Sequence, residues 1–230
     1  MTDKRLYGQF CGLASALDVI GERWTLLIIR ELLLGPVRFS ELCDNLPALG
    51  PNLLSTRLQA LTAQGLIEST PVPGDARGKL YRLTPSGEGL RRPVLGLARW
   101  GMRLLDDSVV DVGITRAAWG FLAVEAMVMD SPVPDVDEVY EFRVAEETFH
   151  IDVADGAAVA RRGPGRDPAI VVTTDAETFI RIGAEMLSPF EAAVTGRLTI
   201  EGDLAAVERC TRLMGLSAQP ARASVPDASA

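Results

Sequence analysis

Two short apolar patterns separated by a stiff break constrain the fold of this chain most strongly. Apolar residues repeat at helical spacing over residues 39–46, and residues 47–51 then contain two prolines and a glycine. This break ends one helix and starts another, because Pro51 loses no intrahelical hydrogen bond in the first turn of the new helix. We therefore expect two helices joined by a tight connection.

The second of these helices has an apolar and a polar side. Leucines at 54, 58 and 61 share one face, which we expect to be buried. The opposite side carries Asn52, Ser55, Thr56 and Gln59. Such amide and hydroxyl groups can hydrogen-bond base edges in the DNA major groove, and Arg57 beside them can bind guanine or phosphate. An ordinary solvated helix face explains the same pattern equally well.

The sequence after Gly65 predicts a β-hairpin. Residues 66–72 and 79–83 indicate strands, and residues 73–78 form the turn, with Arg77 and Lys79 at the tip. These cations can neutralise phosphates beside the groove that the preceding helix enters, although a solvated tip needs no particular charge. Two helices followed by a basic hairpin indicate a winged helix-turn-helix that binds duplex DNA.

Apolar helices flank this region. Residues 24–34 are apolar on nearly every side, as expected of a helix buried within its domain. Thr84 and Pro85 form a helix start signal, so residues 86–106 predict one long helix. Its apolar stripe consists of Leu90, Val94, Leu97, Gly101 and Leu104. That stripe can pack inside the chain or against a second copy.

Residues 11–105 resemble a regulator of the HxlR family, a branch of the MarR-like winged-helix repressors and activators. The likeness rests on residues 16–32, 38–42, 54–58 and 81–87. It implies a homodimer whose two recognition helices meet successive major grooves of a roughly palindromic site. Together with the helix and hairpin above, it gives the DNA-binding set Arg38, Asn52, Ser55, Thr56, Arg57, Gln59, Arg77 and Lys79.

Charge divides the chain into two parts. Residues 1–105 carry 13 Lys and Arg against 9 Asp and Glu, whereas the remaining residues carry 10 against 22. This asymmetry indicates two domains with different partners. We expect a DNA-binding and dimerisation domain at residues 1–107, a second domain at residues 108–216, and a disordered tail at residues 217–230.

The second half mixes helix and strand patterns. Helical patterns occur at residues 114–129, 175–185 and 204–216, and strand patterns at 138–144, 148–153, 157–161, 169–174 and 196–203. This order, with Gly196–Asp203 before the last helix, resembles the sterol-carrier-protein-like fold over residues 115–216. The resemblance implies a domain that holds an apolar molecule between a sheet and its helices. The predicted fold class is therefore α+β, with a winged helix-turn-helix followed by this domain.

The large side chains of the second half are the candidates for lining a ligand cavity. They are Trp119, Phe149, Phe179, Met186 and Phe190. An ordinary hydrophobic core would use the same residues.

Three cysteines and one histidine support neither a disulfide framework nor a metal site. Cys43 and Cys210 fall on helical patterns that suit small core residues. Some members of the resembled family sense oxidants or electrophiles through a cysteine near Cys11. A reactive thiol needs exposure and a lowered pKa, so an unreactive cysteine and a sensor both remain open.

The sequence contains no recognisable catalytic constellation, cofactor motif or apolar run long enough to span a membrane. We expect a cytoplasmic, cofactor-free, dimeric DNA-binding transcription regulator, not an enzyme, that responds to a small apolar ligand. One alternative is a regulator that senses oxidants or electrophiles through Cys11. The other is a lipid carrier or interaction protein that does not bind DNA.

Overall fold

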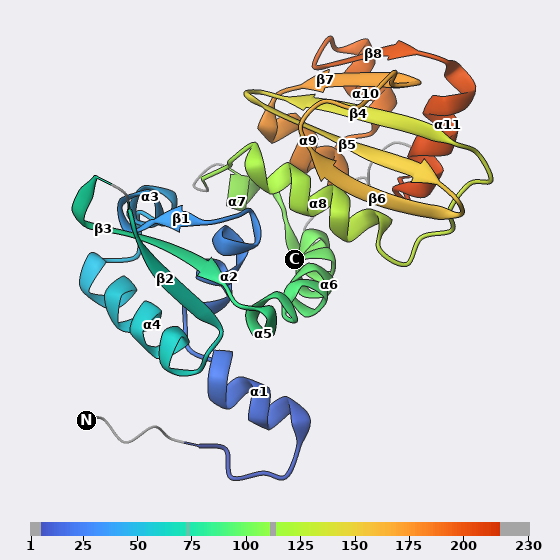
Figure 1. Cartoon of the computed structure of the whole chain (residues 1–230). Helices are drawn as coiled ribbons and strands as arrows, with labels where there is room; N and C mark the ends of the chain where they lie inside the picture. The colour runs from blue at the N-terminus through green and yellow to red at the C-terminus, as the bar shows by residue number, and fades with distance from the viewer. Residues whose placement is uncertain (1–5, 73, 111–113, 217–230) are drawn as a thin grey trace, which may run out of the picture. The chain divides into compact units, whose positions relative to one another are not determined.

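The structure, a computed structural model, describes residues 6–72, 74–110 and 114–216. The chain divides into two compact units, Met1–Val94 and Leu95–Ala230 (Figure 1). This division falls inside a helix and does not locate the end of the winged-helix domain, so the boundary at residue 107 stays a prediction. The tail at 217–230 lies outside the described residues.

The first unit contains the predicted helices and hairpin. Its elements are α1 (Gly12–Ile20), α2 (Thr25–Leu33), β1 (Val37–Arg38), α3 (Phe39–Asn45), α4 (Pro51–Ala63), β2 (Ile67–Val72), β3 (Asp75–Leu83) and α5 (Pro85–Glu88). Helix α6 (Arg91–Gly101) begins in this unit and continues into the second. The strands form an antiparallel sheet in the order β1-β3-β2.

The tight connection between α3 and α4 is confirmed. Pro51 occupies the first turn of α4, where its missing N–H costs no hydrogen bond. Leu54, Leu58 and Leu61 are almost completely buried, so these three leucines hold α4 on the core by one face. The two-residue strand β1, which pairs Val37 with Tyr81, was not predicted because so short a segment has no periodicity to detect.

The predicted long helix at residues 86–106 was wrong. The chain instead forms α5, a turn at residues 89–90, α6, and the 3-10 helix η1 (Met102–Leu104). The break has a covalent cause, because Pro93 has no N–H to donate to the carbonyl of Gly89 four residues earlier. Of the predicted stripe, Val94 is buried, whereas Leu97 and Leu104 are exposed.

Helix α5 is anchored against the end of the hairpin. The Thr84 side chain accepts a hydrogen bond from the Gly87 N–H at 3.2 Å and donates one to the Gly65 carbonyl at 2.6 Å. Gly87 is buried, and a Cβ at this position would overlap the Leu66 carbonyl oxygen. Only glycine therefore allows this close approach of α5 to the backbone before β2.

The second unit is an α+β domain. After α7 (Asp107–Val110) it contains α8 (Ala118–Val128), β4 (Glu138–Val144), β5 (Glu147–Ala154), β6 (Ala157–Arg162), β7 (Ile170–Thr174), α9 (Ala176–Gly183), α10 (Pro189–Val194), β8 (Leu198–Gly202) and α11 (Leu204–Leu213). The sheet order is β6-β5-β4-β7-β8, with β4 and β7 parallel and the other pairs antiparallel (Figure 1). The five predicted strands are all present, and α10 was not predicted.

Aromatic rings fill the middle of this domain. Phe142 on β4 stacks on Phe149 of β5 with ring centroids 5.7 Å apart, and Phe179 of α9 contacts both rings edge-on. Phe121 of α8 reaches Phe149 from another helix, at 6.1 Å. Such edge and offset contacts add to the burial of apolar surface, and they hold α8 and α9 on one face of the sheet.

Among the described residues, no helix combines the length and the apolar character that crossing a bilayer requires.

Candidate functional site

The polar side of α4 is open to solvent, as predicted. Asn52, Thr56 and Gln59 are exposed, and Ser55 is half-buried. The Thr56 hydroxyl donates to the Asn52 carbonyl at 3.0 Å. Within the part of the chain that the structure describes, the side chains of Asn52 and Gln59 make no hydrogen bond. Their amides are therefore available to a ligand that meets this face.

The Arg57 side chain packs against another part of the protein, unlike the exposed polar side chains of α4. Its guanidinium donates to Glu22 Oε2 at 2.7 Å and, through Nε, to the Arg23 carbonyl at 3.3 Å. Only 19% of the side chain is exposed. Both acceptors belong to the turn before α2, so Arg57 spans from α4 to that turn.

The hairpin carries one described basic side chain near its tip. Lys79 is exposed on β3, opposite Pro71 of β2. Arg77 also belongs to β3, but its side chain lies outside the described part of the structure. Arg38, on β1, is exposed and lies 3.9 Å from the Asp75 carboxylate. Lys79 and Arg38 are therefore two exposed cations on strands that both pair within the same sheet.

The second unit contains an apolar hollow that is partly open to solvent. Its walls come from α8, β4, β7, α9, α10, β8 and α11, and they include Ala123, Met127, Phe142, Val172, Phe179, Ile182, Ile200, Val207, Cys210 and Met214. The Thr211 hydroxyl in this wall already donates to the Val207 carbonyl at 2.7 Å. An occupant would therefore find an almost wholly apolar surface.

The residues predicted to line a cavity lie mostly elsewhere. Phe179 lines the hollow, but Trp119, Phe149, Met186 and Phe190 are not part of its wall. Phe149 is fully buried within the ring cluster, and Phe190 is 74% exposed. Besides the rings of Phe142 and Phe179, the wall of the hollow consists of smaller side chains, most of them aliphatic.

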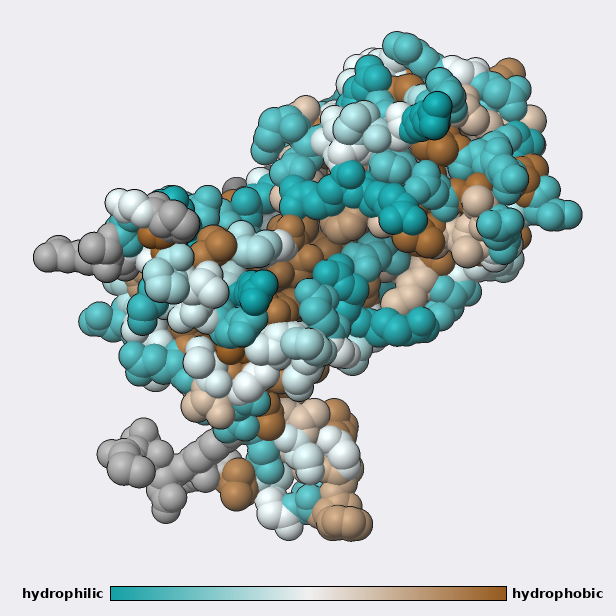
Figure 2. Space-filling model, in the orientation of Figure 1, coloured by the Kyte–Doolittle hydropathy of each residue, from teal (hydrophilic) through white to brown (hydrophobic). Residues whose placement is uncertain are grey.

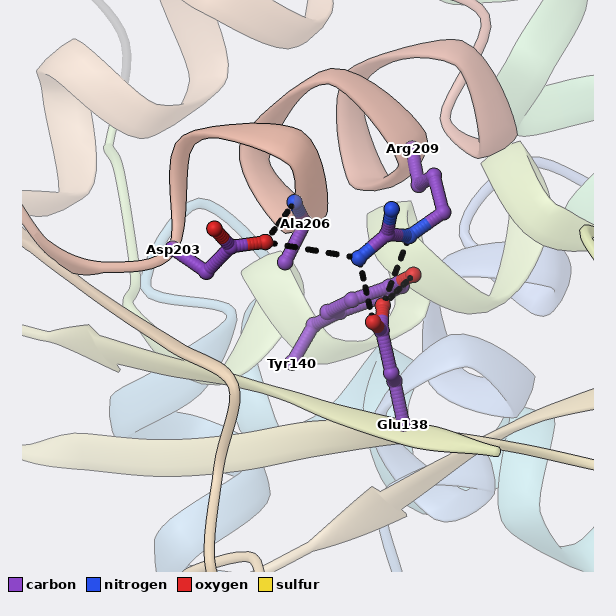
Figure 3. A network of polar contacts seen from close by, with 5 residues as sticks. All are labelled: Glu138, Tyr140, Asp203, Ala206 and Arg209. Atoms are coloured by element: carbon purple, nitrogen blue, oxygen red, sulfur yellow. Dashed lines mark hydrogen bonds and ion pairs between the residues drawn. The ribbon is translucent and has the colours of Figure 1, made fainter. Parts of the chain in front are cut away.

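A polar network ties α11 to β4 (Figure 3). Arg209 of α11 binds Glu138 of β4 through both Nη2 and Nε, and the Tyr140 hydroxyl donates to the same carboxylate at 2.8 Å. Asp203 accepts the Ala206 N–H at 2.9 Å and caps α11. The hydrogen bonds from Arg209 lower the pKa of Glu138, and burial raises the pKa of Tyr140. Glu138 is thus held as a carboxylate.

The three cysteines differ in environment. Cys210 is buried in the hollow wall, and burial raises the pKa of its thiol well above the ordinary value. Cys43 is half-buried. Cys11, immediately before α1, is exposed, and the backbone N–H groups of Ala14 and Leu13 lower its pKa. Among the described residues, no three His, Cys, Asp or Glu side chains are grouped as a metal site requires.

Known proteins match the two units separately. Residues 19–109 match the HxlR-like helix-turn-helix family. The HTH-type transcriptional regulator Rv3095 of Mycobacterium tuberculosis, itself uncharacterized, is 43% identical over 97 residues, which are 42% of this chain and 60% of the relative. This chain thus matches less than two thirds of that relative's length. The regulator YvaP of Bacillus subtilis is 36% identical over 97 residues that cover 89% of its length. The chain belongs to the HxlR-like helix-turn-helix family.

The second unit matches a different protein family. Residues 125–215 match the SCP-2 sterol transfer family. The chain therefore joins an HxlR-type winged helix-turn-helix to an SCP-2 domain, as the sequence predicted. Among solved structures, the reduced form of the transcriptional regulator YodB from B. subtilis shares 29% identity over 43% of this chain and 97% of its own, with a TM-score of 0.37.

We expect Arg209→Met to lower the thermal midpoint of the native protein by a few degrees at pH 7. Because the folded-state pKa of Glu138 is depressed, its contribution to stability is present above the unfolded pKa and disappears as the pH falls through the folded pKa. The difference between native and variant should therefore shrink below about pH 4. Calorimetry across this range measures it.

Arg212→Met, at an exposed position of the same helix, is the control and should leave the midpoint unchanged. A difference between native and Arg209→Met that stays constant down to pH 2 would contradict a stabilising role for the Glu138 carboxylate.

Proposed function

We propose that this protein is a transcription regulator that binds double-stranded DNA with α4 in the major groove and the β2–β3 hairpin on flanking phosphates. The observation that carries the proposal is the open polar face of α4, whose Asn52 and Gln59 amides have no partner within the described residues. Asn and Gln can bind adenine through two hydrogen bonds, and Ser55 and Thr56 can bind base or phosphate. Arg38, Arg77 and Lys79 supply cations for phosphates.

The regulator is proposed to act as a homodimer. Helix α1 leaves Leu13 and Leu17 exposed, with Tyr7 and Phe10 exposed just before it, and Figure 2 shows hydrophobic residues on the surface at this lower end of the view. Helix α6 likewise leaves Leu97 and Trp100 exposed. Apolar helix faces of this kind are stabilised by a partner, and a symmetric dimer would present two copies of α4 to one duplex.

The SCP-2 domain is proposed to bind a small apolar ligand that changes DNA affinity. The hollow supports this role, because its wall is almost wholly apolar. No catalytic activity is proposed for it. Action on DNA would place the protein in the cytoplasm.

A second candidate is a thiol sensor at Cys11. The observation in its favour is an exposed thiol whose pKa is lowered by two backbone N–H groups. A lowered pKa increases the fraction of thiolate, which is the form that reacts with peroxide. This candidate uses the same DNA-binding surface as the first proposal, but the signal is an oxidant instead of an apolar ligand.

Selection from a random duplex library tests DNA recognition. Gln59→Ala should weaken binding to the selected duplex by about 1–3 kcal/mol and relax the preference at one position of each half-site. Lys79→Ala should weaken binding to selected and unrelated duplexes alike and reduce the salt slope by about one. Gln64→Ala, at an exposed position at the end of α4, is the matched control. If the native protein selects no sequence, the proposal is wrong.

A dansyl-labelled fatty acid tests the hollow. The native protein should take up the probe with enhanced fluorescence, and Ala123→Phe should lose uptake because the new ring fills the hollow that Ala123 lines. Ala205→Phe places the same ring on an exposed position of α11 and should bind the probe normally. Equal uptake by both variants would exclude this hollow as the binding site. The affinity for the selected duplex, measured with and without probe, tests the response.

Hydrogen peroxide tests the thiol sensor. Treatment should change the affinity of the native protein and of Cys43→Ser for the selected duplex, and it should leave Cys11→Ser unaffected. Attack of the thiolate on peroxide yields a sulfenic acid and water, and a dithiol reductant should restore the original affinity. The same response in Cys11→Ser would rule out this thiol as the sensor.

A further inference from the structure

We propose that Arg57 positions the recognition helix and does not read bases. Its contacts run from α4 to the turn before α2, at Glu22 Oε2 and the Arg23 carbonyl. The inference rests on the proposed DNA binding, and it assigns one residue of that surface a role different from the one its sequence position suggests.

Helix geometry separates Arg57 from the reading face. Residues advance by about 100° around an α-helix, so Arg57 lies about 140° from Asn52 and about 160° from Gln59. This direction is nearer the buried leucines than the open polar side. The structure agrees, because only 19% of the Arg57 side chain is exposed, whereas Asn52 and Gln59 are exposed residues. Reaching a base from this side would require the ion pair to open.

The turn that Arg57 holds is locally strained. Trp24, at the start of α2, has a φ of 78°, which is uncommon for a bulky residue. Such a conformation persists when its surroundings fix it. The Nε hydrogen bond fixes the Arg23 carbonyl directly before Trp24, and the Arg23 guanidinium lies over the Trp24 ring at 5.3 Å. Arg57 therefore couples the orientation of α4 to this turn.

Among the described side chains of α4, Arg57 makes the polar contacts with another element, and the apolar face of the helix supplies the other restraint. Leu54, Leu58 and Leu61 fix the side of α4 that meets the core, but apolar contacts are non-directional and leave small rotations inexpensive. A guanidinium with two separate acceptors adds directional restraint. Because Glu22 is 61% exposed, the pair adds little to overall stability. Its effect should appear in DNA binding, where a small error in helix placement loses several base contacts together.

The direction in which one substitution changes the DNA affinity distinguishes base reading from positioning of α4. Glu22→Gln removes a negative charge, which by general electrostatics favours DNA binding. If Arg57 reads bases, Glu22→Gln also weakens the contact that holds its guanidinium away from DNA and should tighten binding further. If Arg57 positions α4, Glu22→Gln should weaken binding to the selected duplex by up to about fivefold, the limit that the strength of an exposed ion pair sets. Arg57→Ala should weaken it by a similar factor, and the double variant should be no weaker than either single one.

The experiment uses the full chain and the duplex that the native protein selects. Affinities are measured at several salt concentrations, well below the thermal midpoint of each variant. The expected result is lower affinity with an unchanged preferred sequence and an unchanged salt slope, and an intermediate affinity for Arg57→Lys, which keeps the charge but not both donors. A purely structural role would lower the midpoint and leave the affinity of the folded protein unchanged.

Glu88→Gln is the matched control. It makes the same change of charge in the same unit and removes the ion pair of Glu88 with Arg91 at 3.1 Å, and it should not weaken binding. Tighter binding by Glu22→Gln, or an altered preferred sequence for Arg57→Ala, would overturn the proposal. Failure of the native protein to select any sequence would instead overturn the proposed function, and the inference with it.

Discussion

The burial of three leucines on α4 is the constraint on which the DNA-binding arrangement depends. Once Leu54, Leu58 and Leu61 face the core, the helix period decides where every other side chain of α4 points. Asn52, Thr56 and Gln59 must face solvent, and Arg57 must lie at the flank of the packed side. Residues that are close in the sequence therefore differ in their contacts. Asn52, Thr56 and Gln59 face solvent, whereas the Arg57 guanidinium binds Glu22 within the protein.

The periodic segments were predictable from the sequence, and the contacts between segments were not. The leucine spacing identified α4 and its buried side, and alternation with turn signals identified the strands β4–β8. Pro93 was visible in the sequence, yet the apolar stripe around it favoured one continuous helix, and the missing N–H decided otherwise. The acceptors of Arg57 are more than 30 residues away in the chain, so no local pattern could indicate them.

Contacts between distant segments also explain why the cavity lining of the second unit differs from the one predicted. Large apolar residues suggested a cavity lining, but rings that can reach one another pack together, and Phe121, Phe142, Phe149 and Phe179 do so over β4 and β5. The hollow forms where smaller side chains from β7, β8 and α11 leave the space less completely filled. A space for an apolar guest therefore depends on where the aromatic cluster ends, which is a property of the fold and not of any one residue type.

The outermost strand β6 has a consequence for the behaviour of the protein in concentrated solution. It pairs with β5 in the described sheet, and helix α8 lies beside it. Arg161 and Arg162 end this strand and are engaged by Asp152 and Glu147 of β5. Charged side chains at an edge oppose intermolecular strand addition, so we expect Arg161 and Arg162 to disfavour pairing of β6 with a strand of another copy.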